Sequence, residues 1–555
     1  MVTTLLVNTF SGMMPGVSPR LLGEANAQKS INCDFRSGAL DSMRAPAQIM
    51  NLAKAPPVLG LHRHIQSEPD ETKYWFHWNT DVDVVTGLMA NDTEEFTYLT
   101  GDIYPKMTYF TAAVSGGGGN YPVIAYQLGT PAPDSAPSPS VLVPGTGDDE
   151  LRYYVYTYVA KYLSGSRVFE GPPSPAASVT TKATGSTVRV SGLGTSAPSM
   201  GAFPNTGNYA ITHKRVYRTV SGATGEYFYV GEVPISQSTL DDNLPSTTVS
   251  LQGVLNSTTW DAPPADLKGL IAINNGMLAG FAGRDWYCSE INQPHAWPRD
   301  YRKSLESEIV AHRAIGGNAV VVATKTIPYI IAGTRPESMS REPLSTFPQA
   351  CVSKRSMVAG LGGAWYASPD GLCVVGPGIQ QIVTPMTQAQ WQAYKPETMH
   401  AYWFEGMYIA FFDTGVRKGA LIYDHATKSM HESDVYATGG YVDPIRDALY
   451  LAVTESGVAK LKKWGAGEAM TKTWRSRQYQ LPRPMNMAWG RVTASSYPVT
   501  LKVYADGEEY TYTVSKPVEF TLHPKLAKVL EMEVTCTGTV HQIALSDDID
   551  ELAQV

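Results

Sequence analysis

The stretch Gly363-Ala-Trp-Tyr-Ala-Ser-Pro369 places two aromatic residues and a small alanine directly before a turn. Four other stretches share its pattern, in which two large apolar or aromatic residues precede an alanine. The five stretches, called repeat segments below, are NGMLAGF from Asn275, AVVVATK from Ala319, GAWYASP from Gly363, GMYIAFF from Gly406 and ALYLAVT from Ala448. A pattern that returns five times indicates an architecture built from repeated units.

The spacing of the repeat segments identifies the kind of unit. Their alanines are Ala279, Ala323, Ala367, Ala410 and Ala452, at intervals of 44, 44, 43 and 42 residues. Strand-type units with a period of about 40 to 50 residues are typical of β-propeller blades. Short apolar runs bounded by Gly, Asn or Asp indicate buried strands. We predict that each segment is the inner strand of a blade, and that KYWFHWN at Lys73–Asn79 is a sixth candidate.

The composition agrees with an all-β fold. The 555 residues include 49 Gly, 38 Pro and 10% aromatic residues, whereas charged residues reach only 17%, below the roughly 25% of an average chain. Glycine and proline supply turns, and β-branched and aromatic residues favour strands. The predicted fold class is therefore all-β, with a roughly six-bladed pseudo-propeller.

Two stretches of different character interrupt the repeats. Residues 129–150 are rich in Pro and Ser and predict an extended linker. Beyond them, LRYYVYTYVAKYLSGSRVFEGPPSP and KRVYRT with EYFYVGEV alternate as strands of a β-sandwich do, and their order resembles a fibronectin type III module. After Trp464 the repeat stops and a further set of alternating strands predicts a small C-terminal β domain.

The predicted domain boundaries follow from these changes of pattern. They are 1–128 for an N-terminal segment with the first blade or blades, 129–150 for the linker, 151–250 for a fibronectin type III-like insertion, 251–470 for the remaining blades and 471–555 for the C-terminal β domain.

Charge and cysteine content limit the function classes. The formal net charge of −7 gives the chain no overall attraction for nucleic acid or an anionic membrane. Its five cysteines are scattered, without a CxxC pair or metal-ligand spacing, which favours free buried thiols: Cys33, Cys288, Cys351, Cys373 and Cys536. The first residues lack the basic region and apolar run of a signal peptide, so we expect a chain made in a cytoplasm.

Catalytic signals are weak throughout the sequence. It lacks GxxxxGK[ST], HExxH, GxSxG, an EF-hand loop and a GxGxxG motif that opens a helix. We therefore predict no catalytic, cofactor-binding or metal-binding residue, no cofactor, and no enzyme activity.

Five local patterns nevertheless have a chemical alternative to their structural interpretation. His62 and His64 could ligate a metal but lack a third ligand nearby, and His213–Arg215 could contact phosphate but also fits an alternating strand. Asp81–Asp83 favours turn chemistry over a calcium site, and Gly116–Gly119 favours a flexible loop over a phosphate cradle. Asp370 lies in a SPDG turn without the Thr-Trp continuation of a sialidase Asp box.

One stretch resembles a known family. The N-terminal SGMMPGVSPRLLGEANAQKSINCDFRSGALDSMRAP, Ser11 to Pro46, is similar to the opening of the tail tubular protein B family, which forms the tail nozzle of short-tailed bacteriophages. The features that carry the resemblance are Gly16–Pro19, Asn32, Ser37–Leu40 and Arg44–Pro46. The late stretch RSRQYQLPRPMNMAWGRV at Arg475–Val492 agrees with it.

This resemblance implies a virion structural protein made in the host cytoplasm. The family's expected assembly is a homo-oligomeric, hexameric ring of pseudo-propellers below the head-to-tail adaptor, with tail fibres or spikes beside it and a tip or plug below. Double-stranded DNA leaves the capsid through the lumen of the ring and is not bound tightly, which suits a chain with few Lys and Arg. The resemblance implies neither a catalytic residue nor membrane insertion.

Two other classes stay open at this point. A propeller with a fibronectin-like module also suits a carbohydrate-binding or carbohydrate-active protein, for which a signal peptide and a cluster of carboxylates and arginines on one blade face are expected. A host-receptor-binding tail protein is the other alternative, for which repeated fibrous shaft segments are expected.

Overall fold

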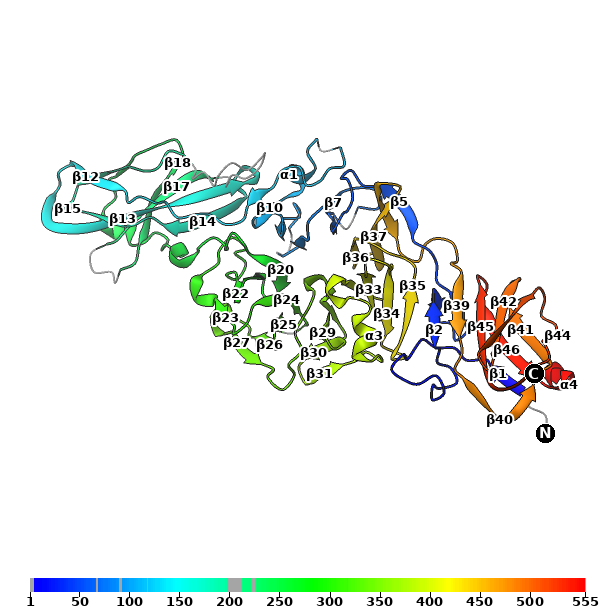
Figure 1. The fold of residues 1–555 in the computed structure, drawn as a ribbon. Helices are drawn as coiled ribbons and strands as arrows, with labels where there is room; N and C mark the ends of the chain where they lie inside the picture. Colours follow the sequence, from blue (N-terminus) through cyan, green and yellow to red (C-terminus); the bar gives the residue numbers. More distant parts are fainter. Residues whose placement is uncertain are drawn as a thin grey trace.

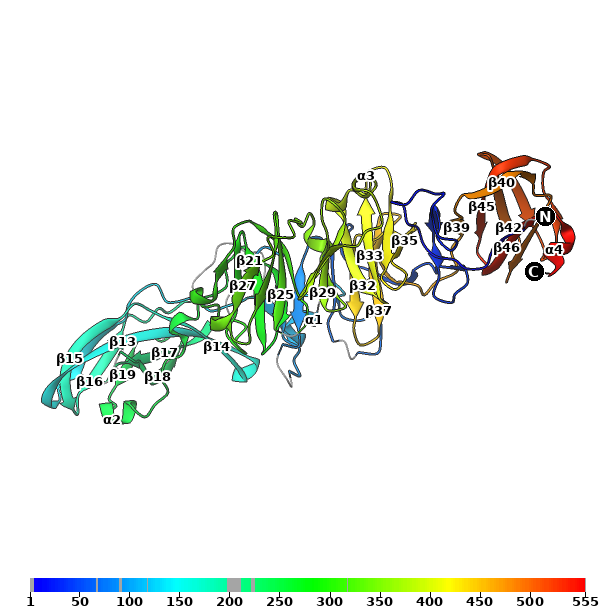
Figure 2. The same cartoon turned by 90° about the horizontal axis from the view of Figure 1, so that it is seen from below.

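The chain forms an elongated all-β structure with three parts in a row. The structure is a computed structural model, and it describes residues 4–65, 68–88, 92–116, 118–196, 211–220, 225–316 and 318–554. Figures 1 and 2 show a β-sandwich at one end, a propeller in the middle and the C-terminal domain at the other end, beside the N-terminus. The predicted fold class is confirmed.

The propeller contains six sets of four antiparallel strands within the described residues. Five of them are separate four-stranded sheets, whereas the set β32–β35 is one end of a ten-stranded sheet that continues through β2 (Lys29–Ile31) into the C-terminal domain. The six sets are β8–β11 (Asp83–Thr86, Thr97–Thr100, Lys106–Thr108, Tyr126–Gln127), β20–β23 (Lys268–Ile273, Met277–Ala282, Asp285–Cys288, Lys303–Ser304), β24–β27 (Ile309–Ala314, Ala319–Thr324, Pro328–Ala332, Ser340–Pro343), β28–β31 (Val358–Gly360, Gly363–Ala367, Leu372–Gly376, Ile379–Ile382), β32–β35 (His400–Phe404, Met407–Asp413, Lys418–Asp424, Ser429–Ser433) and β36–β38 (Gly439–Asp443, Ala448–Glu455, Val458–Lys463) with β5 (Ala47–Asn51). A two-stranded sheet of β6 (Gly60–Arg63) and β7 (Trp75–Trp78) packs beside the last of them.

The repeat segments are equivalent, but they are not the inner strands of the blades. Their alanines lie on β21, β25, β29, β33 and β37, each the second strand of its sheet, and all five side chains are buried. The strands that contact from blade to blade are β8, β20, β24, β28, β32, β36 and β6, in that order, so the two-stranded sheet lies between the sheets of β36 and β8. Second strands are covered on both faces, so they are apolar throughout and give the clearest sequence signal. The stretch Lys73–Asn79 contains β7, which belongs to the two-stranded sheet.

The propeller is closed by a strand from the beginning of the chain. Strand β5 pairs antiparallel with β38, which places Met50 opposite Leu461 and Ala47 opposite Lys463. The last blade therefore receives its fourth strand from residues that precede the first blade in sequence.

The N-terminal segment also joins the propeller to the C-terminal domain. Strand β1 (Thr4–Val7) pairs with β46 (Val540–Ser546), and β2 (Lys29–Ile31) lies between β35 of the propeller and β39 (Lys472–Arg475). The other elements of this region are β3 (Cys33–Asp34), β4 (Asp41–Ser42), β40 (Tyr479–Asn486), β41 (Trp489–Ala494), β42 (Val499–Ala505), β43 (Glu508–Val514), β44 (Phe520–Thr521), β45 (Leu526–Cys536) and helix α4 (Ile549–Gln554). The C-terminal domain thus includes residues that the sequence analysis placed in the 1–128 segment.

The inserted β-sandwich begins earlier than predicted. Strand β12 (Ser138–Val143) and the start of β13 (Thr146–Tyr162) lie inside the predicted 129–150 linker, because β12 pairs with β16 (Thr187–Ser191). The three-stranded sheet is β12, β16 and β19 (Leu240–Asp242), and the five-stranded sheet contains β13, β14 (Arg167–Pro173), β15 (Ala177–Thr184), β17 (Ile211–Arg218) and β18 (Phe228–Pro234).

The sandwich is fixed to the propeller by a shared hydrophobic core. Tyr162 and Phe169 at its base pack in one cluster with Phe96, Leu270 and Trp297 of the propeller. The 17-residue strand β13 runs from the tip of the sandwich into this cluster. The insertion is therefore joined to the propeller by a packed interface as well as by the chain.

Helices are few and short among the described residues. They are α1 (Phe110–Val114), α2 (Ser246–Val249), α3 (Gln388–Gln392) and α4, with 3₁₀ helices η1 (Leu163–Gly165), η2 (Ser257–Thr259), η3 (Arg299–Tyr301), η4 (Pro336–Ser338), η5 (Lys354–Ser356) and η6 (Pro396–Thr398). In the part of the chain that the structure describes, no helix has the length and apolar character needed to cross a membrane.

Enlarging a repeat alanine should destabilise the propeller. Ala367 and Ala410 are 0% and 1% exposed, so Ala367→Leu and Ala410→Leu insert volume into packed second strands. We expect each to lower the free energy of unfolding by about 1–3 kcal/mol. Ala136, which is half-buried outside any strand before β12, is the control, and Ala136→Leu should melt like the parent chain. Unchanged thermal midpoints for both blade variants would contradict the equivalence of the repeats.

Candidate functional site

The propeller axis is occupied by charged side chains. The Nζ of Lys354, on η5, lies 2.9 Å from Asp81 and 2.5 Å from Asp83 at the start of β8. The Arg355 side chain donates to the carbonyl oxygens of Leu59 and Thr438 at 2.9 and 2.7 Å. Because η5 also contacts β24, β29 and β32, this cluster connects several blades around the axis.

Electrostatics hold the cluster in its charged form. Burial alone would lower the pKa of Lys354, but Asp83 and Asp81 raise it above its usual value. One Asp83 oxygen also accepts a hydrogen bond from the Gly269 backbone N–H at 3.0 Å. The Asp81–Asp83 pattern is therefore part of an ion-pair cluster. Sequence reasoning missed its partners, because 271 residues separate Asp83 from Lys354 and no local motif connects them.

His62 and His64 are core residues of the two-stranded sheet region. The His64 ring stacks on Phe76 with centroids 4.7 Å apart, and its Nδ1 lies 3.2 Å from the hydroxyl oxygen of Thr97. Burial lowers the pKa of His62 to about 3 and that of His64 to about 4, so both rings are neutral at pH 7. The structure packs them among aromatic rings and brings no third ligand to them; among the described residues it forms no cluster of three His, Cys, Asp or Glu suited to a metal.

The His213–Arg215 stretch lies on β17, and its Lys214 and Arg215 side chains bind other groups of the same chain. The buried Lys214 ammonium donates to the carbonyl oxygens of Gly194 and Gln237, both at 2.6 Å, and burial lowers its pKa to about 8. Arg215 forms ion pairs with Glu170 at 2.7 Å and Glu232 at 3.0 Å. Neither cation is available to a phosphate.

The two remaining patterns are turns. Ser368 Oγ accepts hydrogen bonds from the backbone N–H groups of Asp370 and Gly371, both at 3.2 Å, while Gln349 and Gln388 donate to the Asp370 carboxylate. Gly116, Gly118 and Gly119 have positive φ and open space at the Cβ position, and Gly117 lies outside the described residues. The five cysteines are free and buried.

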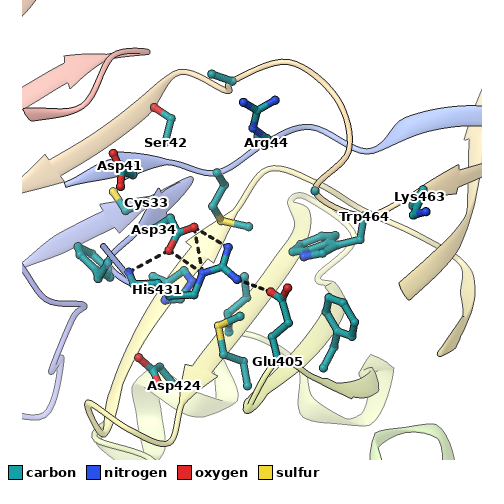
Figure 3. Close-up of a pocket in the computed structure, with 18 of the residues that line it drawn as sticks. Cys33, Asp34, Asp41, Ser42, Arg44, Glu405, Asp424, His431, Lys463 and Trp464 are labelled. Carbon is teal, nitrogen blue, oxygen red and sulfur yellow. Dashed lines mark hydrogen bonds and ion pairs between the residues drawn. The ribbon is translucent and has the colours of Figure 1, made fainter. Parts of the chain in front are cut away.

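A cavity of about 490 Å³ lies between the propeller and the C-terminal domain (Figure 3). Three segments enclose it: the β3–β4 hairpin, the turn at Glu405 between β32 and β33, and residues 463–469 after β38. The apolar part of its wall includes Phe404, Ile422 and Trp464, and Figure 3 shows Trp464 across the cavity from Asp34.

An ion-pair chain forms the polar wall of this cavity. Arg36 donates to both oxygens of Asp34, at 2.9 Å from Nε and 2.6 Å from Nη2, and also pairs with Glu405. Burial would raise the pKa of Asp34, but the hydrogen bonds from Arg36 lower it below its usual value. His431 is 5% exposed with no partner for Nδ1, and burial lowers its pKa to about 4. The sequence analysis did not identify these residues, although Asp34 and Arg36 lie in the Ser11–Pro46 stretch.

Known proteins show little similarity to this chain. No protein-family model matches the chain, and no curated protein matches it. Among solved structures, a streptogramin B lyase is 10% identical, with a TM-score of 0.25 over 59% of this chain and 97% of the lyase. The extracellular domain of a hybrid two-component system from B. thetaiotaomicron is 9% identical, with a TM-score of 0.22 over 91% of this chain and 59% of that one. Similarities at this level carry no argument about function.

Removing the axial cation should destabilise the propeller. Lys354→Met leaves Asp81 and Asp83 without their shared partner, and the Lys354 side chain is only 18% exposed. We expect the free energy of unfolding to fall by about 1–3 kcal/mol, measured by urea denaturation. Lys325→Met is the matched control, because Lys325 pairs with Glu308 where both side chains are more than half exposed, and its effect should stay within about 1 kcal/mol. Equal effects of the two variants would contradict a structural role for the axial cluster.

The buried histidines should make the fold sensitive to mild acid. Burial lowers the pKa of His400 to about 3, helped by nearby Arg355, against 6.5 for the free side chain. Between these values the unfolded chain binds a proton that the folded chain does not, so stability is fully present above pH 6.5 and falls as the pH falls toward 3.

We expect His400→Gln to weaken the pH dependence of stability between pH 6.5 and 4.5, measured as the change in urea midpoint. His541→Gln, at an exposed position, should leave that dependence unchanged. A parent chain that is equally stable at both pH values would refute this expectation.

Proposed function

We propose that this chain is a structural component of a bacteriophage short tail, where it forms the nozzle ring below the head-to-tail adaptor and part of the DNA ejection channel. The observation that carries the proposal is the resemblance of Ser11–Pro46 to the opening of the nozzle family. In the fold, this stretch connects the propeller to the C-terminal domain, since β2 pairs with both β35 and β39. A structural role for the stretch is consistent with that position.

The resemblance implies that the DNA channel is the lumen of a homo-oligomeric ring of six copies. Heterologous contacts that close produce such a cyclic ring.

The charge distribution suits passage of DNA without tight binding. The net charge is −7, and the basic residues described above at the axis and on β17 are paired within the chain. Phosphate contacts release counterions and supply most of the non-specific affinity of proteins for DNA. Cations that are already paired in this way gain little from contact with the duplex.

The elongated shape offers separate surfaces for the proposed partners. The sandwich arm and the C-terminal domain lie at opposite ends of the propeller (Figure 2). We propose that the adaptor ring, tail fibres or spikes, and a tip or plug contact different parts of this shape, and that the chain is located in the virion tail. We propose no enzyme activity and no cofactor.

The proposal is tested by locating the chain in particles. Mass spectrometry of purified virions should detect it, and cryo-electron microscopy should place it in a ring below the adaptor. The isolated chain should not bind a 5′-labelled DNA duplex tightly at physiological ionic strength, measured by fluorescence anisotropy. Absence of the chain from the tail would refute the proposal, as would turnover of a polysaccharide or sialoside that is lost when one carboxylate is replaced.

A further inference from the structure

The cavity between the propeller and the C-terminal domain has features of a ligand site that the proposed tail role does not explain. Its volume of about 490 Å³ lies within the roughly 300–1,000 Å³ typical of small-molecule sites. Its walls combine an apolar side and a polar side, an arrangement that fixes the orientation of a ligand. We infer that this cavity binds a short, neutral saccharide.

The charges of the cavity argue against an anionic ligand. Five carboxylates and three cationic groups line it: Asp34, Asp41, Glu405, Asp424 and Asp447 against Arg36, Arg44 and Lys463. Each cation already has a partner within the chain. Arg36 pairs with Asp34 and Glu405, Lys463 lies 2.9 Å from Glu71, and Arg44 donates to the Gly467 carbonyl at 3.2 Å. A phosphate or carboxylate ligand would meet five carboxylates, and among the described residues Arg44 is the only lining cation without an ion pair.

The same groups suit the hydroxyls of a sugar. An ionised carboxylate has two oxygens that together accept about four hydrogen bonds. The Asp34 carboxylate already accepts four from Arg36, but Glu405 keeps acceptor capacity beyond its bond to Arg36. The buried Nδ1 of His431 has no partner, and the ring is neutral at pH 7. A hydroxyl both donates and accepts, so it can pair with either tautomer of that ring.

The apolar wall supplies the second half of saccharide recognition. Trp464 and Phe404 face the cavity together with Met43 and Met407. A pyranose ring has one face of C–H groups, which packs against an aromatic ring while the hydroxyls around its rim reach polar groups. Aromatic side chains contribute the largest apolar contact area of any residue type. Trp464 and the Asp34–Arg36–Glu405 chain thus provide both kinds of contact in one cavity.

Saturation-transfer NMR on the full chain tests this inference. The panel contains free neutral mono- and disaccharides, a neutral polysaccharide, and spermidine as a cationic competitor. We expect signal transfer to at least one neutral sugar, and comparison of free sugars with the polymer distinguishes a soluble ligand from a surface glycan. Glu405→Gln and Trp464→Leu should each weaken that binding roughly tenfold or more, measured by titration.

Matched variants keep the test specific to the cavity. Glu308→Gln removes another exposed, ion-paired carboxylate, and Trp489→Leu removes another half-buried tryptophan, and neither residue lines the cavity. Both should bind the sugar as the parent does, with thermal midpoints confirming that all four variants fold. The inference is overturned if no neutral sugar binds, if only spermidine binds, or if both cavity variants keep parental affinity. None of these outcomes bears on whether the chain is found in a tail.

Discussion

One antiparallel pairing, between β5 and β38, closes the propeller. It joins Met50 to Leu461 and Asn51 to Lys460, so the ring cannot close before nearly the whole chain is available. Contacts between residues so distant in sequence form slowly, because the loop-closure entropy must be overcome first. Until β5 docks, β38 is an exposed edge, and Lys460, Lys462 and Lys463 place charges along it that oppose edge-to-edge aggregation.

The same N-terminal segment determines the relation between propeller and C-terminal domain. Strand β1 completes a sheet of the C-terminal domain, β2 bridges β35 and β39, and β5 closes the ring. The Gly12 Cβ position lies 2.5 Å from the Met430 carbonyl oxygen, so a larger residue could not pass so close to the propeller. About fifty residues thereby hold the propeller and the C-terminal domain together.

The sequence was sufficient for the architecture where its signal is local and repeated. The intervals between Ala279 and Ala452 identified five equivalent strands, because second strands are covered on both faces and must be apolar along their length. Periodicity does not say which strand of a blade carries the signal, and we placed these strands one position too close to the axis. The sheet β8–β11 has no such segment, so its strands were not identified, although a first blade or blades were expected within residues 1–128.

Pairings across long separations were beyond sequence reasoning. The local sequences of β1, β2 and β5 do not identify their pairing strands, which lie about 400 residues or more further along the chain. Strand β12 is a similar example, because it forms by pairing with β16. The candidate site also depends on contacts between residues that are distant in sequence. Asp81 and Asp83 were visible as a pattern, but their chemistry depends on Lys354, and the cavity exists only where Arg36 meets Glu405.

Two of the fully buried ion pairs of this chain lie where separate sheets meet. Arg63 and Asp443, both fully buried, lie 3.5 Å apart where β6 meets β36, and Arg218 and Asp242 lie 2.8 Å apart between the two sheets of the sandwich. Buried ion pairs add little net stability, because desolvation offsets the Coulomb attraction, but a misaligned joint would leave them unpaired at a cost of several kcal/mol. These ion pairs therefore disfavour structures in which the sheets meet in a different orientation.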